Sequence, residues 1–471
     1  MNTASKPVLG LVITDGVGYR NFVLSNFLKE ANKYFSKIII YTGLPKEVYT
    51  QLEINEKIEI LELPVYRETS QSWFWRKFKE VAHLQLHKGF FGINDNLKGN
   101  YPKSNSNRSL VTKLIFGITN HFHSEEFIQW LERQQQRTIS TQQTTKACKE
   151  ILKKHPADLL FFTHQRPPYV LPLFTAAKEC GIKTSAFIFS WDNLSSKGRM
   201  AATFDFYVVW SELMKKELLY FYPATPTENV KVGGTPQFEP YVLPKYSTSR
   251  EEFFRRFDID PELRTICYSC GDISTSKNDE LYISIIAEAI LRKQIDEKSN
   301  FIVRTSPAEA PDRFLKLKEK YPFIKWNFPA WYLARQDHPE PWSQRLPKPE
   351  DLRDLRSLLE YCDLNVNMCS TMGLDFMLFD KPVVNPVLGN ENNGLYNDQR
   401  FLNFGHYENV VKTGATKIVT RQEELIEAIN QYLETPGKQK EERKELVNMQ
   451  IGVSLDRTSG VIASQLSKFC Q

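Results

Sequence analysis

Three side chains suited to general-base chemistry lie directly after short apolar runs in the N-terminal half of the sequence. A carboxylate or an imidazole in such a loop can take the proton of an attacking hydroxyl that it reaches. Asp192 is the first candidate, because Trp, Asp and Lys coincide in its loop, and His164 and Asp15 are the alternatives. The runs that precede Asp15, His164 and Asp192 are Val8–Thr14, Asp158–Phe162 and Lys183–Phe189.

The loop that carries Asp192 is polar and holds a further cation. Lys197 can neutralise a phosphate, and Asn193 and Arg166 can contact an acceptor or a phosphate. Because consecutive parallel strands often lie side by side, we expect the His164 loop beside the Asp192 loop. Two plainer interpretations stay open: Asp192 and Asn193 can form an Asx-turn, and His164 can be an ordinary polar loop residue.

Ser370 and Thr371 predict an anion-binding position in the C-terminal half. They follow the strand-like stretch Asp363–Asn367 and start a helix, whose free backbone N–H groups and positive dipole end attract phosphate. Gly373 lies in the same turn, and Asp375, one turn deeper, can accept hydrogen bonds from a ribose diol. The plainer interpretation of this pattern is an ordinary helix cap.

Two more strand ends of the C-terminal half add candidates for binding a donor phosphate. Arg304 and Ser306 follow one strand, and the planar guanidinium of arginine suits phosphate. Gly271 follows another strand, and a residue without a side chain permits close backbone approach. A salt bridge at the strand end is the plainer interpretation of Arg304.

Short apolar strands alternate with helical stretches in both halves, which predicts two doubly wound α/β domains. Prolines crowd together after Gly233-Gly234 and indicate a linker. We therefore expect an acceptor-side Rossmann-like domain at 1–235, a nucleotide-donor Rossmann-like domain at 236–450, and a helix at 451–471 that packs back toward the first domain. Two such domains are expected to face a cleft, where ligands meet the carboxyl ends of the strands.

Residues 66–125 interrupt this alternation and are predicted to be an insertion. Between residues 71 and 113 they combine aromatic and basic side chains, a composition typical of segments that lie on anionic membrane. The alternative is that the aromatics pack on the domain and the lysines form a solvated rim. The residues concerned are Trp73, Phe74, Trp75, Phe78, Phe90, Phe91, Arg76, Lys77, Lys79 and Lys88.

The composition excludes several classes of protein. The chain has 471 residues, of which 41% are hydrophobic and 25% charged, as in ordinary globular domains. A net charge of +5 is too small to indicate a nucleic-acid partner. Seven cysteines without a framework spacing favour a reducing compartment. We expect a cytoplasmic protein that can be peripheral on the inner face of the plasma membrane.

The stretch Asp363–Val384, with Ser370, Thr371 and Asp375, resembles the donor-site signature of glycosyltransferases with the GT-B fold. The loop at 190–198 and the segment at 301–307 resemble further motifs of that group, in its bacterial surface-polysaccharide branch. That branch includes enzymes similar to CDP-glycerol glycerophosphotransferases and polysialyltransferases. The resemblance implies transfer from a nucleotide sugar to a hydroxyl of a surface polysaccharide or lipid-linked glycan. We expect inversion more than retention, because a Lys/Arg-plus-Glu pattern is missing, and no cofactor or metal, because no loop carries a DxD-like carboxylate pair that would demand Mg²⁺.

Two departures from the group's pattern keep other functions open. Asp375 stands where Glu is usual, and Ser306 stands where the group has His. The alternatives are a CDP-alcohol glycerophosphotransferase-like enzyme, a UDP-sugar 2-epimerase-like enzyme, and a non-catalytic nucleotide-binding protein on the same fold.

Overall fold

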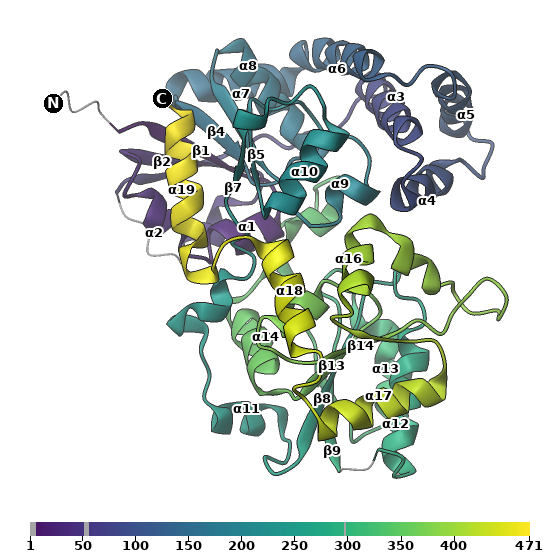
Figure 1. Cartoon of the computed structure of the whole chain (residues 1–471). Coiled ribbons are helices and arrows are strands. Elements are labelled where there is room, and N and C mark those ends of the chain that lie inside the picture. The colour runs from purple at the N-terminus through teal and green to yellow at the C-terminus, as the bar shows by residue number, and fades with distance from the viewer. Residues whose placement is uncertain (1–5, 51–55, 296–297) are drawn as a thin grey trace. The chain divides into compact units, whose positions relative to one another are not determined.

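The chain divides into two compact units, each built on its own parallel sheet. The computed structural model describes residues 6–50, 56–295 and 298–471 (Figure 1). The first unit comprises Met1–Glu239, Leu333–Leu346 and Gln450–Gln471, and the second comprises Pro240–Tyr332 and Pro347–Met449. The short segment Leu333–Leu346, called here the crossing segment, therefore belongs to the first unit although it lies within the C-terminal half of the sequence.

The first unit holds a seven-stranded parallel sheet with the order β3-β2-β1-β4-β5-β6-β7. Its central strands are buried along nearly their whole length, as expected for a sheet with helices on both faces. The strands are β1 (Val8–Ile13), β2 (Lys37–Thr42), β3 (Ile58–Glu62), β4 (Leu159–Phe162), β5 (Lys183–Phe187), β6 (Phe206–Val209) and β7 (Val230–Val232).

The helices of the first unit connect these strands, and the last helix returns to it from the end of the chain. α19 packs against α2 beside the sheet (Figure 1). The helices are α1 (Gly16–Phe22), α2 (Phe27–Ala31), α3 (Ser70–Leu86), α4 (Phe91–Asn100), α5 (Asn107–Thr119), α6 (Glu125–Ser140), α7 (Gln143–Lys154), α8 (Leu171–Glu179), α9 (Asn193–Ser196), α10 (Glu212–Phe221) and α19 (Thr458–Phe469).

The segment expected to be an insertion consists of helices. α3, α4 and α5 follow β3, and α3 packs along α6 (Figure 1). The sequence suggests one long helix over about 125–154, whereas the structure has two, α6 and α7. The break falls where Ser and Thr, weak helix formers, cluster. There the Ile139 carbonyl accepts from the Gln142 N–H at 3.0 Å and from the Thr145 hydroxyl at 2.7 Å.

The second unit holds a six-stranded parallel sheet with the order β10-β9-β8-β13-β14-β15. A separate two-stranded ribbon, β11-β12, leads into and out of the crossing segment. The strands are β8 (Arg264–Ser269), β9 (Ser299–Arg304), β10 (Lys325–Asn327), β11 (Trp331–Leu333), β12 (Arg345–Pro347), β13 (Leu364–Val366), β14 (Val383–Pro386) and β15 (Lys417–Val419).

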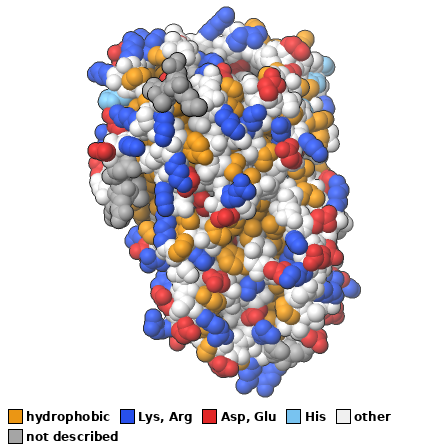
Figure 2. All heavy atoms as spheres, turned by 60° about the vertical axis from the view of Figure 1, so that its left-hand side comes forward, with side chains coloured by type: hydrophobic (Ala, Val, Ile, Leu, Met, Phe, Trp, Pro, Cys, Tyr) orange, Lys and Arg blue, Asp and Glu red, His pale blue; other side chains and the backbone are white. Residues whose placement is uncertain are grey.

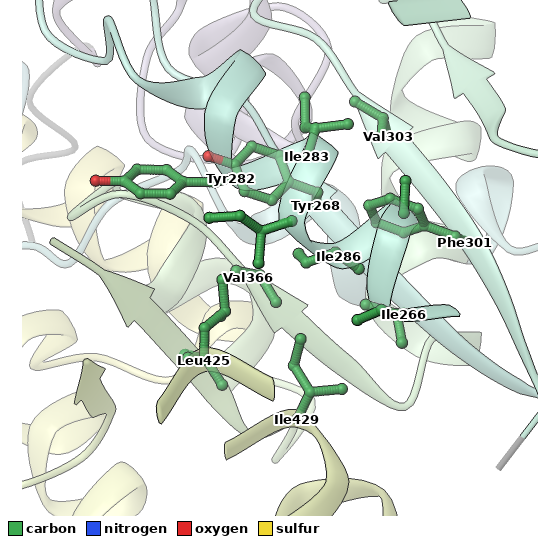
Figure 3. Close-up of a cluster of buried hydrophobic side chains, with 14 of the residues drawn as sticks. Ile266, Tyr268, Tyr282, Ile283, Ile286, Phe301, Val303, Val366, Leu425 and Ile429 are labelled. Carbon is green, nitrogen blue, oxygen red and sulfur yellow. The ribbon is translucent and has the colours of Figure 1, made fainter. Parts of the chain in front are cut away.

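Helices cover the sheet of the second unit and close its core. Figure 3 shows side chains from β8, β9, β13, α12 and α17 meeting in one cluster, including Ile266, Phe301, Val366, Ile286 and Leu425. The helices are α11 (Arg250–Phe257), α12 (Asp279–Leu291), α13 (Leu315–Lys320), α14 (Pro349–Tyr361), α15 (Met372–Met377), α16 (Gly405–Thr413), α17 (Gln422–Glu434) and α18 (Lys440–Ile451).

Both sheets share one arrangement, in which the strand order runs 3-2-1 and then reverses to 4-5-6. This is the doubly wound Rossmann order, and its point of reversal opens a crevice at the carboxyl ends of strands one and four. In the first unit the reversal lies between β1 and β4, and in the second between β8 and β13. The predicted fold, α/β with two Rossmann-like domains, is confirmed.

Charged side chains are mixed on the surface: Lys, Arg, Asp and Glu are interspersed over the face drawn in Figure 2, in keeping with the small net charge. Among the helices described here, none combines the length and the apolar character that crossing a bilayer requires.

Candidate active site

The reversal point of the first sheet brings Asp15 and His164 into contact. Asp15 follows β1 and His164 follows β4, and these two strands are paired in parallel. His164 Nδ1 lies 2.8 Å from Asp15 Oδ2. Asp15 is fully buried, and 6% of His164 is exposed. Two of the three residues predicted as base candidates are therefore in direct contact.

Local chemistry fixes the position of Asp15. Its Oδ1 accepts a hydrogen bond from the Gly18 N–H at 2.8 Å and caps α1, which begins at Gly16. A Cβ added at Gly18 would lie 2.6 Å from Thr163 Oγ1, which explains why the turn after β1 requires glycine there.

The carboxylate orients the His164 ring. Carboxylate oxygens accept hydrogen bonds, so the tautomer that suits this contact has Nδ1–H donating to Asp15 and the lone pair on Nε2. Phe189 stacks on the imidazole with ring centroids 3.8 Å apart and planes 11° apart. Nε2 makes no hydrogen bond within the described part of the chain. A buried carboxylate, a fixed imidazole and an available nitrogen are the parts of a general base.

The Asp192 loop lies beside the His164 loop, as predicted from strand adjacency. Gln165 Nε2 donates to Asn193 Oδ1 at 2.9 Å, and β4 pairs with β5. Both oxygens of Asp192 have partners: Lys197 Nζ lies 3.3 Å from Oδ2, and Asn193 Nδ2 donates to Oδ1 at 3.2 Å. These contacts leave Asp192 less suited than the Asp15–His164 pair to taking a proton.

Arg166 follows His164 by two residues and remains a candidate for an anionic group. Its Nε is buried and has no hydrogen-bond partner among the described atoms. A guanidinium without a partner is uncommon in a folded domain, because buried polar groups are nearly always paired.

The crossing segment forms one wall of this site, and the sequence analysis did not assign it. Its backbone lies directly on the start of α1: a Cβ added at Gly16 would be 1.7 Å from the Arg345 carbonyl oxygen. Trp342 lies 6.2 Å from His164 between ring centroids, at 70°. The available signal was composition, since 331–346 is rich in aromatic and polar residues and has neither strand nor helix period.

Tyr169 packs against His338 of the crossing segment, with ring centroids 5.4 Å apart. Loss of hydration, and then the charge of Asp15, raise the pKa of Tyr169 well above its ordinary value. Burial lowers the pKa of His338. The Tyr169 phenol therefore stays uncharged beside the Asp15 carboxylate.

In the second unit, the reversal point brings together the loops that carry Gly271 and Ser370. Asn365, on β13, donates to Ser269 Oγ at 2.9 Å, and Asn367 donates to Asn365 Oδ1 at 2.6 Å. The Ser370 N–H donates in turn to Asn367 Oδ1 at 2.8 Å. These buried asparagines, which the sequence analysis overlooked, fix the loop that leads to Ser370 and Thr371.

The Gly271 loop is held by one buried carboxylate. Asp279 accepts from the Gly271 N–H at 3.1 Å and from the Tyr268 hydroxyl at 2.6 Å, and Arg313 lies 3.1 Å away. Burial raises the pKa of Asp279 to about 6. A Cβ at Gly271 would lie 2.6 Å from the Ser276 Cβ, so glycine is required here by the tight turn.

Three other predicted donor-site residues already have protein partners. Arg304 is buried and forms a two-pronged ion pair with Asp351, with both oxygens 3.0 Å from one guanidinium nitrogen. Asp375 is buried and accepts a hydrogen bond from the Tyr241 hydroxyl. Ser306 Oγ accepts from the Ala308 N–H at 3.2 Å. Arg304 would have to leave Asp351 to bind a phosphate, so we omit it from the proposed donor site.

Gly373 lies in the first turn of α15, where a side chain would also fit. A Cβ at this position would lie 3.7 Å from its nearest neighbours, an ordinary distance. Cys369, just before Ser370, adopts φ of 49°, a left-handed conformation that is unusual for a residue with a side chain. Strained backbone of this kind is often found at functional loops.

No protein-family model and no curated protein matches the chain. Solved structures match the fold. A glycosyltransferase from Rickettsia africae is 13% identical over 99% of each chain, with a TM-score of 0.51. A UDP-GlcNAc 2-epimerase from Neisseria meningitidis bound to UDP-GlcNAc is 12% identical over 98% of this chain and 100% of its own, with a TM-score of 0.55.

A third similar structure, a UDP-N-acetylglucosamine 2-epimerase from Listeria monocytogenes, is 11% identical over 99% of this chain and 97% of its own, with a TM-score of 0.53. These glycosyltransferases and epimerases share the GT-B fold, and at such low identity the likeness concerns the fold alone. The chain therefore has the GT-B fold along its whole length.

Proposed function

We propose that this chain is a glycosyltransferase that moves a sugar from a nucleotide sugar to a hydroxyl of a surface polysaccharide or lipid-linked glycan. The observation that carries the proposal is the Asp15–His164 pair at the reversal point of the first sheet. An enzyme that activates a hydroxyl needs a base of this kind, whereas a protein that only binds a nucleotide has no use for one.

In the proposed reaction, His164 Nε2 takes the proton of the acceptor hydroxyl while its oxygen attacks the anomeric carbon. The new C–O bond forms as the bond to the diphosphate breaks, and the electron pair leaves with the nucleoside diphosphate. Asp15 stabilises the imidazolium that results. Attack from the side opposite the leaving group inverts the anomeric centre. We expect the reaction to need no metal and no other cofactor.

The second unit is proposed to hold the donor. Ser370 and Thr371 offer hydroxyls at the carboxyl end of β13, and Gly271 lets backbone approach a phosphate at the end of β8. This is where doubly wound sheets bind nucleotides. Two similar structures are described with UDP-GlcNAc or UDP bound, which supports a nucleotide-sugar ligand for this chain.

An epimerase acting on a UDP-sugar is the second candidate, because several similar structures are UDP-GlcNAc 2-epimerases. One experiment separates the alternatives. The protein is incubated with UDP-GlcNAc, UDP-glucose, GDP-mannose, CMP-sialic acid and CDP-glycerol, with and without an extract of bacterial envelope glycans, and the nucleotides are resolved by chromatography.

Acceptor-dependent release of a nucleotide supports the transferase. Formation of an epimer without acceptor supports the epimerase, and binding of CDP-glycerol with release of CMP supports the glycerophosphotransferase. Stabilisation by a nucleotide in a thermal shift assay without any turnover would indicate a binding protein. Failure of every nucleotide to bind or react would refute the proposal.

We also propose that the helical insertion contacts an anionic membrane, where a lipid-linked acceptor resides. We place the proposed contact surface on α5 rather than on α3. On α3, Arg76 pairs with Glu68, and Lys79 is buried beside Glu132. Trp75 packs against Trp130 at 5.8 Å. Arg76 and Lys79 therefore already have acidic partners, and Trp75 is partly buried.

On α5, by contrast, Leu110 and Leu114 are 54% and 62% exposed, one turn apart. Lys103, Arg108 and Lys113 lie near them in the sequence and supply positive charge. Each cation near an anionic surface contributes about 1 kcal/mol. We propose that Leu110, Leu114 and these three cations contact the membrane, and we call them the α5 surface.

Flotation with liposomes that contain anionic lipid tests the α5 surface. Wild-type protein should float at low salt and less at high salt, because ions screen the attraction. Leu110→Ser with Leu114→Ser should abolish flotation. Leu291→Ser with Leu315→Ser, on two exposed leucines of the second unit, is the matched control and should float normally. A wild type that stays with the soluble fraction at every salt concentration would contradict the proposal.

A further inference from the structure

The crossing segment is anchored to the first unit at several independent points. Arg335 forms an ion pair with Glu62 of β3. The Arg67 guanidinium donates to the carbonyl of Asp337 at 2.9 Å. At its other end, the segment lies on the backbone of Gly16, as described above. Ion pairs, main-chain bonds and close backbone contact together hold the segment in one place beside Asp15 and His164.

This anchored segment presents an exposed tryptophan to the site. Trp342 is 45% exposed, although the segment around it is well packed and its neighbours Ser343 and Gln344 are fully buried. The indole is also oriented, since Nε1–H donates to Glu340 Oε2 at 3.1 Å. Leaving a large ring half in water beside a general base costs hydrophobic stabilisation. What distinguishes Trp342 from other exposed aromatic residues such as Trp130 is its place beside the Asp15–His164 pair.

Trp342 and His164 are direct neighbours. The two ring centroids are 6.2 Å apart and the planes are at 70°, which is an edge-to-face arrangement. Phe189 covers one face of the imidazole. A flat ligand on the indole is therefore held beside the ring that carries the available Nε2.

We propose that Trp342 is the platform for the acceptor, and that the acceptor is a pyranose whose C–H-bearing face stacks on the indole while one of its hydroxyls reaches His164 Nε2. This assignment rests on the proposed function and adds the substrate class of the same site. A pyranose has an apolar face for the ring and hydroxyls at its edge for the base. A glycerol phosphate or a lipid chain lacks that combination.

Glu340 extends the same platform. Its Oε2 accepts the indole N–H, and its Oε1 has no hydrogen-bond partner in the described part of the chain. A carboxylate oxygen beside an aromatic ring can accept a hydroxyl hydrogen of a stacked sugar. The pair Trp342 and Glu340 therefore offers both a stacking face and an edge contact.

Saturation-transfer NMR on the full chain without donor tests the binding part. The probes are the methyl glycosides of β-glucose, β-galactose, β-N-acetylglucosamine, α-mannose and α-rhamnose at millimolar concentration. At least one should receive saturation at its ring C–H protons. Trp342→Ala should weaken that binding about 5–30-fold, the usual effect of truncating an aromatic anchor.

Trp130→Ala is the matched control, because Trp130 is 41% exposed in the same unit but lies on α6. It should bind the glycosides like wild type. Absence of saturation transfer to every glycoside in the wild type, or equal signals from wild type and Trp342→Ala, would overturn the assignment.

Turnover separates this inference from the proposed function. With a donor and acceptor that react, Trp342→Ala should raise the acceptor KM about 5–30-fold. Its affinity for the nucleoside diphosphate should equal that of wild type, because the donor residues are elsewhere. If wild type transfers sugar and Trp342→Ala has an unchanged acceptor KM, the inference fails while the proposed function stands. If wild type binds glycosides but never transfers sugar, the proposed function fails instead.

Discussion

Replacing Asp15 by Asn separates two roles that one buried carboxylate performs. Asp15 caps α1 through Oδ1 and orients His164 through Oδ2. Asn caps helices about as well as Asp, so the start of α1 should remain formed. The amide, however, lacks the negative charge that stabilises an imidazolium. Its NH₂ group can also donate to Nδ1, which favours the tautomer with the hydrogen on Nε2.

The expected loss follows from the role of His164 as the base. Removing general-base catalysis lowers turnover by about 10²–10⁴-fold, which corresponds to about 3–5 kcal/mol of transition-state stabilisation. Because Asp15 acts through His164 and does not touch the acceptor, kcat should fall while the acceptor KM stays near its wild-type value. Asp15→Ala should lose the cap as well, at an additional cost of about 0.5–2 kcal/mol in stability.

The assay is the rate of nucleoside diphosphate release at saturating donor, with thermal unfolding measured on the same samples. His164→Gln should lose as much activity as Asp15→Asn, and the double variant should lose little more, since the pair works as a unit. Asp192→Asn is the comparison, and it should lose less. Near-normal turnover of Asp15→Asn together with inactive, folded Asp192→Asn would refute this reasoning and return the base to Asp192.

Three further predictions concern the second unit and the buried charges. Ser370→Ala with Thr371→Val should weaken nucleotide binding at least tenfold in calorimetry without lowering the melting temperature, and unchanged affinity would remove the assigned donor site. Asp351→Ala should lower the free energy of unfolding in urea by about 3–5 kcal/mol, because it strands the buried Arg304 charge; a loss below about 1 kcal/mol would contradict this. Burial lowers the pKa of His83 well below its ordinary value. Below about pH 6.5 the unfolded chain therefore protonates this imidazole while the folded chain does not, and the free energy of unfolding should fall by about 1.4 kcal/mol per pH unit. His83→Phe should flatten that slope in urea titrations at pH 7.5 and 5.5, and parallel slopes would show that His83 does not cause it.

The two Rossmann-like sheets were predictable because local signals suffice for them. Strands such as Val8–Ile13 and Leu159–Phe162 are short, apolar and buried on both faces, and helical stretches separate them. The adjacency of the His164 and Asp192 loops also followed, since it needs only the rule that sequential parallel strands tend to be neighbours.

The contacts that decide each residue's role were not predictable, because they join positions distant in the sequence. Arg304 is of a residue type that often binds phosphate, and it lies at a strand end. Only the fold shows that Asp351, 47 residues later, neutralises its charge. The Asp15–His164 contact spans 149 residues. The start of α1 at Gly16 was not predictable either, because the side-chain cap of Asp15 on Gly18 is invisible to periodicity.

The crossing segment was missed for a related reason. The apolar residues of 333–346 do not recur at the spacing of a strand or a helix, so hydrophobic patterning predicts neither an element nor a position in the fold for them. Their position depends on the ion pair of Arg335 with Glu62, which lies 273 residues earlier. The aromatic and polar composition of residues 331–346 was the available signal, and it indicates a functional loop rather than a location.

The most direct test of the central claim is a proton NMR time course of wild-type protein with a reactive nucleotide sugar, recorded with and without acceptor. The account predicts that the donor's anomeric signal decays only when acceptor is present, and that the new glycosidic proton has the opposite anomeric configuration. His164→Gln should leave the donor signal unchanged over the same period. Conversion of the donor to an epimer without acceptor, or a product with retained configuration, would contradict the account.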